Sequence, residues 1–370
     1  MALTEIYVDP AIAADSGAGT VGDPYGDLEY AIEQETFDLT NGTRVNTKDG
    51  TDEILVANIA TAMADTSVSI AWVPGELFPL VFQGYTSTAG DGGIGGISGG
   101  GSVTVCTSIA LDYVNFVDMH LHNCGSATVI DLDNFCAVLR CEVDNTTGGG
   151  VLLDGGSLIM SNYIHNVGTI GATAHQGSYI VHNFYENGIN KFNMCIGGQN
   201  SALYIGRNIC KIDSTSDGIE VGQDAYAENN SIWSDGGTGQ GIFSIDARIA
   251  SAIINNIVEG FSGAGGIGYD LDNATFGIKV YGGNASYDNA THFNAPGLYL
   301  IDDLGDNEIL TESPFMDAAN GDFRPRNVGN IYFGALPSGY HANAPTNIIQ
   351  LHKGAVQPMP HPAPPRAWRF

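Results

Sequence analysis

The sequence predicts an all-β fold of the solenoid class, in which short parallel strands from successive coils stack along one axis. The main observation is a run of asparagines separated by 21, 25, 22, 26 and 28 residues, at Asn162, Asn183, Asn208, Asn230, Asn256 and Asn284. One short structural unit per period is the signature of a solenoid. The composition agrees, because Gly is abundant (50 of 370 residues) and charged residues are few (15%). Glycine supplies the positive φ angles that corners between short strands need.

The asparagine repeat defines a frame along the chain, which extends backwards to Cys141 and Met119. Stacked Asn side chains can hydrogen-bond from one coil to the next, as amide ladders do in stacked strands. Four residues before the frame position, Tyr179, Tyr204 and Tyr226 fall in consecutive coils, and we expect them to stack inside the solenoid or at a corner. The row two residues after the frame position contains Leu121, Val143, Ile164, Tyr185, Cys210, Ile232, Val258 and Ser286. Seven of these eight side chains suit an interior.

The first hundred residues show a less regular pattern. We expect strands over 6–10, 53–57 and 80–85, each bounded by turn signals. Asp27 can cap a short helix that continues to about Gln34. The Gly-rich run 89–101 is expected to be a loop, and it lacks the following Lys-Ser/Thr and helix start of a phosphate-binding loop.

Several segments carry a resemblance to a known group of proteins. They are Ile6-Tyr-Val-Asp-Pro10 with Asp23-Pro-Tyr-Gly-Asp27 near the start, and Glu312-Ser-Pro-Phe-Met-Asp-Ala-Ala-Asn-Gly-Asp-Phe-Arg324 near the end. Together with the repeat, they resemble the right-handed parallel β-helix (pectate-lyase-like) proteins of bacteria and phages. The resemblance implies a right-handed, single-stranded parallel β-helix with a short N-terminal capping helix. It implies no single activity, because this scaffold hosts lyases, hydrolases, adhesins and virion proteins.

We expect four segments: an N-terminal cap with the first coils (1–102), regular coils (103–300), a closing segment (301–336) and an extended Pro-rich tail (337–370). The tail has seven prolines and a charge of +3, whereas the rest of the chain carries −28 − 3 = −31. Pro-rich chains favour extended conformations. Aromatic and Arg side chains concentrate binding energy, so we expect the tail to be an assembly arm anchored by Lys353, Arg366, Trp368, Arg369 and Phe370.

Charge and cysteine usage narrow the partners and the compartment. A net charge of −28 repels nucleic acid and anionic membranes, so neither is an expected partner. The six cysteines form no Cys-x-x-Cys pair, and we expect them to be reduced and the protein to assemble in a cytoplasm. The start of the chain does not read as a signal peptide. The expected location is a virion made in the host cytoplasm, or alternatively outside the cell after removal of a signal.

One outward row of the solenoid holds the candidate catalytic residues. Three residues after the frame position, His122, Asp144, His165 and Glu186 form a line of acid and base groups. Such a line could perform acid–base chemistry on a polysaccharide. It could equally be a ladder of favourable cross-strand charge pairs, which is the commoner origin of such a pattern.

Basic residues and metal ligands are the other candidates. Lyases of the family that the chain resembles usually combine bound calcium with an Arg or Lys that abstracts a proton. In the row one residue before the frame position, the only Arg or Lys residues are Arg140 and Arg207. The pair His120 and His122 can share one strand face, which alone is weak evidence for metal. We expect no cofactor, with calcium at an acidic loop as the alternative. The acidic loops contain Asp131/Asp133, Asp213/Asp217, Asp270/Asp272 and Asp302/Asp303/Asp306.

The leading functional expectation is a virion structural protein, such as a capsid decoration, fibre or tail component of a phage. Its rigid acidic body would project, and its basic tail would dock on other virion proteins or on copies of itself. The first alternative is a lyase or hydrolase of acidic polysaccharides, and the second is a glycan-binding adhesin that uses Trp233 and exposed tyrosines.

Overall fold

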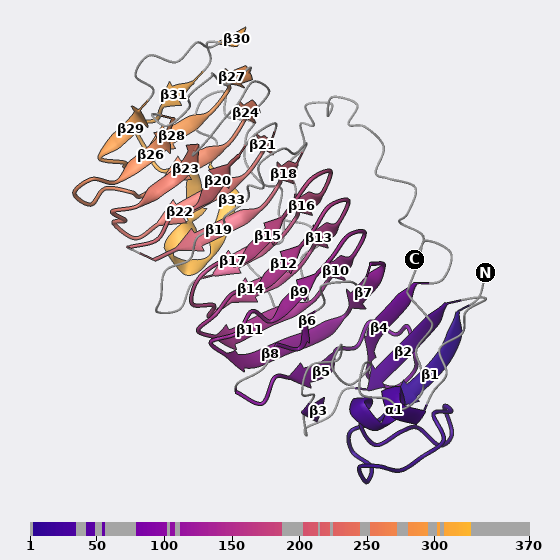
Figure 1. Cartoon of the computed structure of the whole chain (residues 1–370). Helices are drawn as coiled ribbons and strands as arrows, with labels where there is room; N and C mark the ends of the chain where they lie inside the picture. The colour runs from indigo at the N-terminus through magenta and orange to yellow at the C-terminus, as the bar shows by residue number, and fades with distance from the viewer. Residues whose placement is uncertain are drawn as a thin grey trace.

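The computed structural model describes residues 3–34, 42–48, 54–55, 79–101, 104–107, 112–186, 203–213, 215–222, 225–244, 252–271, 280–294, 302–303 and 307–326. These residues form an all-β parallel solenoid, which confirms the predicted fold class. Figure 1 shows the coils stacked one behind another from the indigo N-terminal strands to the orange C-terminal ones. The right hand of the solenoid, which the resemblance implies, stays a prediction. The 337–370 tail and its five anchoring residues lie outside the described residues.

Two long sheets run the whole length of the solenoid, and we call them sheet I and sheet II. In the described ranges, sheet I has twelve strands, in the order β1 (Thr4–Val8), β2 (Thr43–Lys48), β4 (Leu80–Tyr85), β7 (Val114–Val117), β10 (Ala137–Leu139), β13 (Leu158–Met160), β16 (Tyr179–Val181), β18 (Tyr204–Gly206), β21 (Tyr226–Glu228), β24 (Ala252–Ile254), β27 (Val280–Gly282) and β30 (Asp302–Asp303).

Sheet II follows sheet I along the chain in each coil. Its eleven strands within the same ranges are β3 (Ile54–Leu55), β5 (Gly95–Ser98), β8 (Met119–Gly125), β11 (Glu142–Thr146), β14 (Tyr163–His165), β17 (Phe184–Glu186), β19 (Ile209–Ile212), β22 (Ser231–Ser234), β25 (Ile257–Glu259), β28 (Ala285–Tyr287) and β31 (Glu308–Ile309).

The third side of the solenoid consists of two separate four-stranded sheets. The described strands of the first are β6 (Cys106–Thr107), β9 (Ile130–Leu132), β12 (Val151–Leu153) and β15 (Ala172–Ala174). Those of the second are β20 (Ile219–Val221), β23 (Gln240–Ser244), β26 (Ile267–Asp270) and β29 (Thr291–Asn294). After the last coil, β32 (Phe315–Asp317), the 3₁₀ turn η1 (Ala318–Asn320) and β33 (Asp322–Pro325) form an antiparallel hairpin.

The N-terminal part contains one helix. It also contains two strands, β2 and β5, that the sequence analysis did not predict. The helix α1 (Leu28–Gln34) starts after Asp27, whose Oδ1 accepts a hydrogen bond from the Tyr30 N–H at 2.6 Å. That it caps the solenoid stays a prediction. The strand β2 lies between β1 and β4 in sheet I. The Gly-rich run was expected to be a loop, but β5 within it pairs with β8. Gly95 is required there, because a Cβ would lie 2.4 Å from the Thr47 carbonyl oxygen.

The corner between sheet I and sheet II is built in the same way in eight consecutive coils. The residue before each frame position has a left-handed backbone, with φ between 51° and 65°, at Asp118, Arg140, Ser161, His182, Arg207, Asn229, Asn255 and Gly283. The left-handed backbone conformation is unfavourable for every residue except Gly, and among the others Asn and Asp tolerate it best. The corner therefore needs compensating interactions, and the following residue supplies them.

The six frame asparagines form a buried hydrogen-bonded ladder just inside this corner. Asn183 Oδ1 accepts from the backbone N–H of Asn162 at 3.0 Å and from its Nδ2 at 2.9 Å. Asn183 Nδ2 also donates to the Ile159 carbonyl at 3.0 Å. The same bonds recur along the ladder, which continues one coil beyond the predicted six residues to Asn307.

The row two positions after the frame contributes to the solenoid interior, as the frame predicts. All eight residues two positions after the frame are buried, including Ser286 and the thiol of Cys210. The five described cysteines are free and buried. The three tyrosines, however, lie on the outer face of sheet I, where they alternate with buried residues such as Ile180 and Ile205. Tyr226 is 47% exposed, so the expected interior position was wrong.

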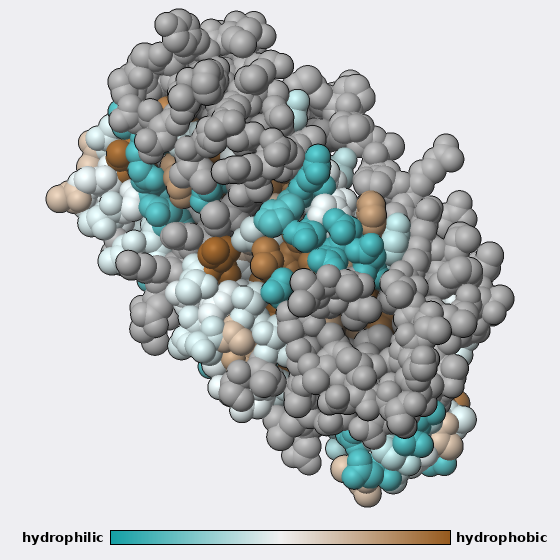
Figure 2. Space-filling view, viewed as in Figure 1, coloured by the Kyte–Doolittle hydropathy of each residue, from teal (hydrophilic) through white to brown (hydrophobic). Residues whose placement is uncertain are grey.

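The outer face of sheet I also carries an apolar cluster. Val81, Val117, Ala137 and Leu139 pack together there, with Leu158 and Met160 at the edge of the group. Figure 2 shows that hydrophilic and hydrophobic side chains reach the surface next to one another over the middle of the molecule in this view. No helix in the described ranges has the length and apolarity needed to span a membrane.

The Asn ladder is expected to be a major source of stability. Asn208→Ala removes four side-chain hydrogen bonds and leaves the buried Asn183 N–H without its acceptor. An unsatisfied buried group costs about 1–3 kcal/mol, so the free energy of unfolding should fall by about 3 kcal/mol or more in urea titrations followed by circular dichroism.

The matched control for this variant is Asn229→Gly at the preceding corner residue. It keeps the left-handed backbone, because Gly283 occupies the equivalent position, and it leaves the ladder intact. It should change the free energy of unfolding by less than about 1 kcal/mol. An equal loss in the two variants would contradict the importance of the ladder.

Candidate functional site

The candidate site lies on the outer face of sheet II. Side chains alternate between the two faces of a strand, so residues one and three positions after the frame point outward, while the residue between them is buried. In β8 the outward residues are His120 and His122, and Leu121 is fully buried between them. The strand register pairs Glu142 with His120 and Asp144 with His122. The next pairs are His165 with Glu186 and Glu186 with Lys211.

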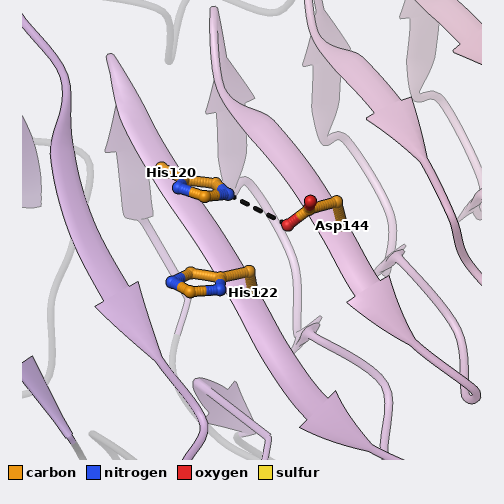
Figure 3. A group of neighbouring side chains, drawn as sticks. All are labelled: His120, His122 and Asp144. Atoms are coloured by element: carbon orange, nitrogen blue, oxygen red, sulfur yellow. Dashed lines mark hydrogen bonds and ion pairs between the residues drawn. The ribbon is translucent and has the colours of Figure 1, made fainter. Parts of the chain in front are cut away.

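At the N-terminal end of this face, two histidines meet one aspartate. His120 Nε2 lies 2.9 Å from Asp144 Oδ1, and Figure 3 shows the tip of the His120 ring directed at that carboxylate. The His120 and His122 rings stack with their centroids 4.1 Å apart and 9° between their planes. His122 is buried, with 6% of its surface exposed. Because its ring stacks on that of His120, it holds His120 from one side.

Asp144 also belongs to a second group, with Glu142 and His165. His165 Nε2 lies 3.0 Å from Glu142 Oε1 and 3.7 Å from Asp144 Oδ2. Its other ring nitrogen lies 2.9 Å from Asn166 Nδ2. One imidazole nitrogen therefore faces two carboxylates, and Asp144 connects the two histidines through its two oxygens.

The network continues into the next two coils through Tyr163 and Glu186. The Tyr163 ring stacks on His165 at 4.1 Å, and its hydroxyl donates to Glu186 Oε2 at 2.9 Å. Lys211 Nζ donates to Glu186 Oε1 at 2.6 Å. Burial opposes the negative charge of Glu186, but the hydrogen bonds from Lys211 and Tyr163 outweigh it and lower the pKa of Glu186. Glu186 is therefore a paired carboxylate and a poor proton donor.

Two groups on this face have metal-ligating side chains close together. The donor atoms of His120, His122 and Asp144 lie within 4.8 Å of one another, and so do those of Glu142, Asp144 and His165. Nitrogen from histidine and oxygen from carboxylates are ligands that zinc and similar ions accept. The row predicted from the sequence, His122, Asp144, His165 and Glu186, lies along this face. The sequence analysis missed Glu142 and Tyr163, which lie one position after the frame.

The two candidate arginines lie away from this face, at the left-handed corner. Arg140 is bound to Asp118 by two hydrogen bonds, Nε to Oδ1 at 2.7 Å and Nη2 to Oδ2 at 2.8 Å. These bonds raise the pKa of the Arg140 guanidinium. Arg207 occupies the equivalent corner position three coils later, close to the partly buried His182. The Arg140–Asp118 pair is a structural contact between neighbouring coils.

In the C-terminal half of the outer face of sheet II, most residues one position after the frame are apolar and are covered by the closing hairpin. Phe315 and Phe323 of the hairpin pack in one cluster with the outward residues of four sheet II strands, namely Phe184, Ile209, Ile257 and Ala285. Figure 1 shows the yellow β33 turned back along the solenoid beside β19. Trp233 is a partly buried neighbour of this cluster. The signal missed in the sequence was the apolar row one position after the frame, which needs a cover.

The hairpin also buries one carboxyl group of the candidate row. Glu259 is 8% exposed, and its Oε2 accepts a hydrogen bond from Ser313 Oγ at 2.9 Å. The pKa of Glu259 is raised from its ordinary 4.5 to about 7. Burial is the main cause and Asp288 adds to it, whereas the Ser313 hydrogen bond and Arg326 oppose the shift. The carboxyl group thus gains a proton more easily under the hairpin than in the unfolded chain.

In the described acidic loops, Asp213 and Asp217 accept hydrogen bonds from other groups of the protein. Asp213 Oδ1 accepts from the Thr215 N–H at 3.0 Å and from Ser216 Oγ at 3.0 Å. Asp217 Oδ1 accepts from the Gln240 N–H at 2.7 Å. Asp272 and Asp306 lie outside the described residues. The bonds of Asp213 are the turn-forming role of Asp side chains, whereas Asp217 bonds to a residue 23 positions away. Calcium at an acidic loop stays a prediction.

Comparisons with known proteins give little further information. No protein-family model matches the chain, and no curated protein matches its sequence. Two solved structures resemble it weakly, both of the GH136 lacto-N-biosidase from Eubacterium ramulus. The selenomethionine derivative has 11% identity over 83% of this chain and 67% of that chain, with a TM-score of 0.34. The native protein has 12% identity over 82% and 67%, with a TM-score of 0.31.

The buried Glu259 makes stability depend on pH in a defined direction. Because its folded pKa is raised, its contribution is fully present below about pH 4.5 and is lost as the pH rises through about 7. The full shift corresponds to about 3 kcal/mol. Glu259→Gln should therefore gain stability relative to the wild type between pH 5 and about 8, as measured by urea unfolding at each pH.

Glu312→Gln is the control for this prediction, because Glu312 precedes the same hairpin and is exposed. Its stability difference from the wild type should stay constant over the same pH range. A constant difference for Glu259→Gln as well would show that the hairpin does not bury an ionisable carboxyl group.

Proposed function

We propose that the chain is a structural protein, the rigid body of a larger assembly, and that this assembly is a virion. The observation that supports the proposal most is the closing hairpin. In a solenoid each coil contacts only its neighbours, so single coils can separate. The hairpin crosses the coils, because one apolar cluster joins Phe323 to Phe184, Ile257 and Ala285. Such a brace suits a body that must resist deformation.

The polar half of the candidate face supports the same role. Its charged groups pair with one another across neighbouring strands, as in His120 with Asp144 and Lys211 with Glu186. Cross-strand pairs of opposite charge stabilise sheets by about 0.2–1 kcal/mol each. The free, buried thiols suit assembly in a reducing compartment. A capsid decoration, fibre or tail component would use these properties, with the tail as the arm that binds other virion proteins or copies of the chain.

Cross-linking mass spectrometry on the native assembly tests this proposal. Lys353 in the tail should cross-link to a different, shell-forming polypeptide or to a second copy of this chain. Lys211 is the control, because it is paired with Glu186 on the body of the solenoid, and it should give mainly cross-links within the chain. Cross-links from Lys353 only to its own solenoid would argue against an assembly arm.

A polysaccharide-cleaving enzyme is the second candidate, favoured by the closeness of Glu142, Asp144 and His165. Carboxylates and an imidazole at such distances can transfer protons. Incubation with acidic polysaccharides would then produce new chain ends, and His165→Gln should abolish them. Cleavage of this kind would overturn a purely structural role.

A further inference from the structure

We propose that Glu142, Asp144 and His165 form a binding site for one divalent transition-metal ion, with zinc as the ion that fits best. The three side chains stand on two adjacent strands of sheet II, β11 and β14. The inference does not depend on the virion role, since the ligands belong to the solenoid itself.

The charge around His165 Nε2 is the first argument. This nitrogen faces two carboxylate oxygens, of Glu142 at 3.0 Å and of Asp144 at 3.7 Å. A carboxylate only accepts hydrogen bonds, and one imidazole nitrogen carries at most one proton. The three side chains are 13–17% exposed, so water screens them only partly. A dication at this point would neutralise both carboxylates at once.

The distances are the second argument. Zinc binds His nitrogen and carboxylate oxygen at about 2.0–2.2 Å, so tetrahedral ligand atoms lie about 3.3–3.5 Å apart by the same bond lengths. The observed separations of 3.0 and 3.7 Å from Nε2 bracket that value. All three donor atoms fall within 4.8 Å of one another. Small side-chain rotations would therefore complete the coordination without moving the strands.

The neighbouring side chains supply the third argument, because they hold two of the three ligands, Asp144 and His165, from behind. His120 Nε2 binds the other oxygen of Asp144 at 2.9 Å, and the Tyr163 ring stacks on His165. Asn166 lies 2.9 Å from His165 Nδ1. A metal on Nε2 requires the proton on Nδ1, and an amide that turns over presents its oxygen to accept that proton. Partners of this kind orient metal ligands and fix the tautomer.

The donor set also selects among metals. Imidazole suits zinc, copper, nickel and iron, whereas calcium and magnesium prefer all-oxygen sites. Three protein ligands leave a fourth position, which in zinc sites holds water or another molecule. This position faces the outside of sheet II, since the buried Val143 and Ile164 point the other way.

The test uses the untagged full-length chain after dialysis against a chelator. Zinc is titrated calorimetrically, and cobalt is titrated by its visible absorption, which reports coordination by protein ligands. We expect one ion per chain and a zinc-dependent rise in the unfolding midpoint. Glu142→Gln, Asp144→Asn and His165→Gln should each weaken zinc binding by about 10-fold or more, as loss of even an indirect ligand contact does.

Glu186→Gln is the matched control, because Glu186 lies in the same outward row but pairs with Lys211. It should bind zinc as the wild type does. Glu142→Gln keeps the shape of the side chain and a hydrogen-bond acceptor for His165, so its circular dichroism should match the wild type. Three results would overturn the proposal. They are the absence of saturable zinc binding, zinc binding by the three ligand variants that equals that of the wild type, and displacement of zinc by an equal concentration of calcium.

Discussion

The structure depends on the corner between sheet I and sheet II, where a left-handed residue is followed by a ladder asparagine. A side chain in the left-handed region is unfavourable by roughly 1–2 kcal/mol. Seven consecutive coils place a side chain there, and the eighth has Gly283. The ladder offsets this, since each buried Asn amide bonds to the next coil and to a carbonyl of the previous one. Strand faces alternate with period two. A shift of the corner by one residue would therefore turn the candidate face inward and the core outward.

Because the corner fixes which residues point outward, the outer face of sheet II becomes a continuous strip whose chemistry changes along its length. Its first coils present His120, Glu142 and Asp144, which interact with one another. Its later coils present Ile209 and Ile257, which are apolar and lie under the hairpin. The same backbone thus uses ionic pairs in one half and hydrophobic burial in the other to join neighbouring coils.

The sequence frame predicted the ladder and the buried row because both repeat at fixed positions. It missed β2, because the inward Thr43 and Thr47 are polar and hide the alternation. The outward residues of β2 form ion pairs: Arg44 binds Glu5, and Lys48 binds Asp9. It missed β5 because glycine there reflects close backbone contact with Thr47 and not a loop. The closing segment was indicated only by its resemblance. Its contacts with sheet II could not be predicted, because they join residues far apart along the chain, such as Phe323 and Phe184.

The contacts of the candidate site were missed for a different reason. The frame compares residues in one row, whereas the interactions run diagonally, as in His165 with Glu142 and Tyr163 with Glu186. Diagonal neighbours on adjacent strands are within reach of long or aromatic side chains. A search for sites on a solenoid should therefore compare both outward rows together.

Tyr163 shows how the two halves of the face depend on each other. Its ring stacks on His165 and packs against the apolar cluster beside Phe184, while its hydroxyl holds Glu186. Phe184 in turn contacts Phe323, with ring centroids 6.2 Å apart. Docking of the hairpin thus restricts Phe184 and Tyr163, and through Tyr163 it restricts the His165 ring. The orientation of His165 toward its two carboxylates is therefore set partly by the C-terminal hairpin, more than a hundred residues away along the chain.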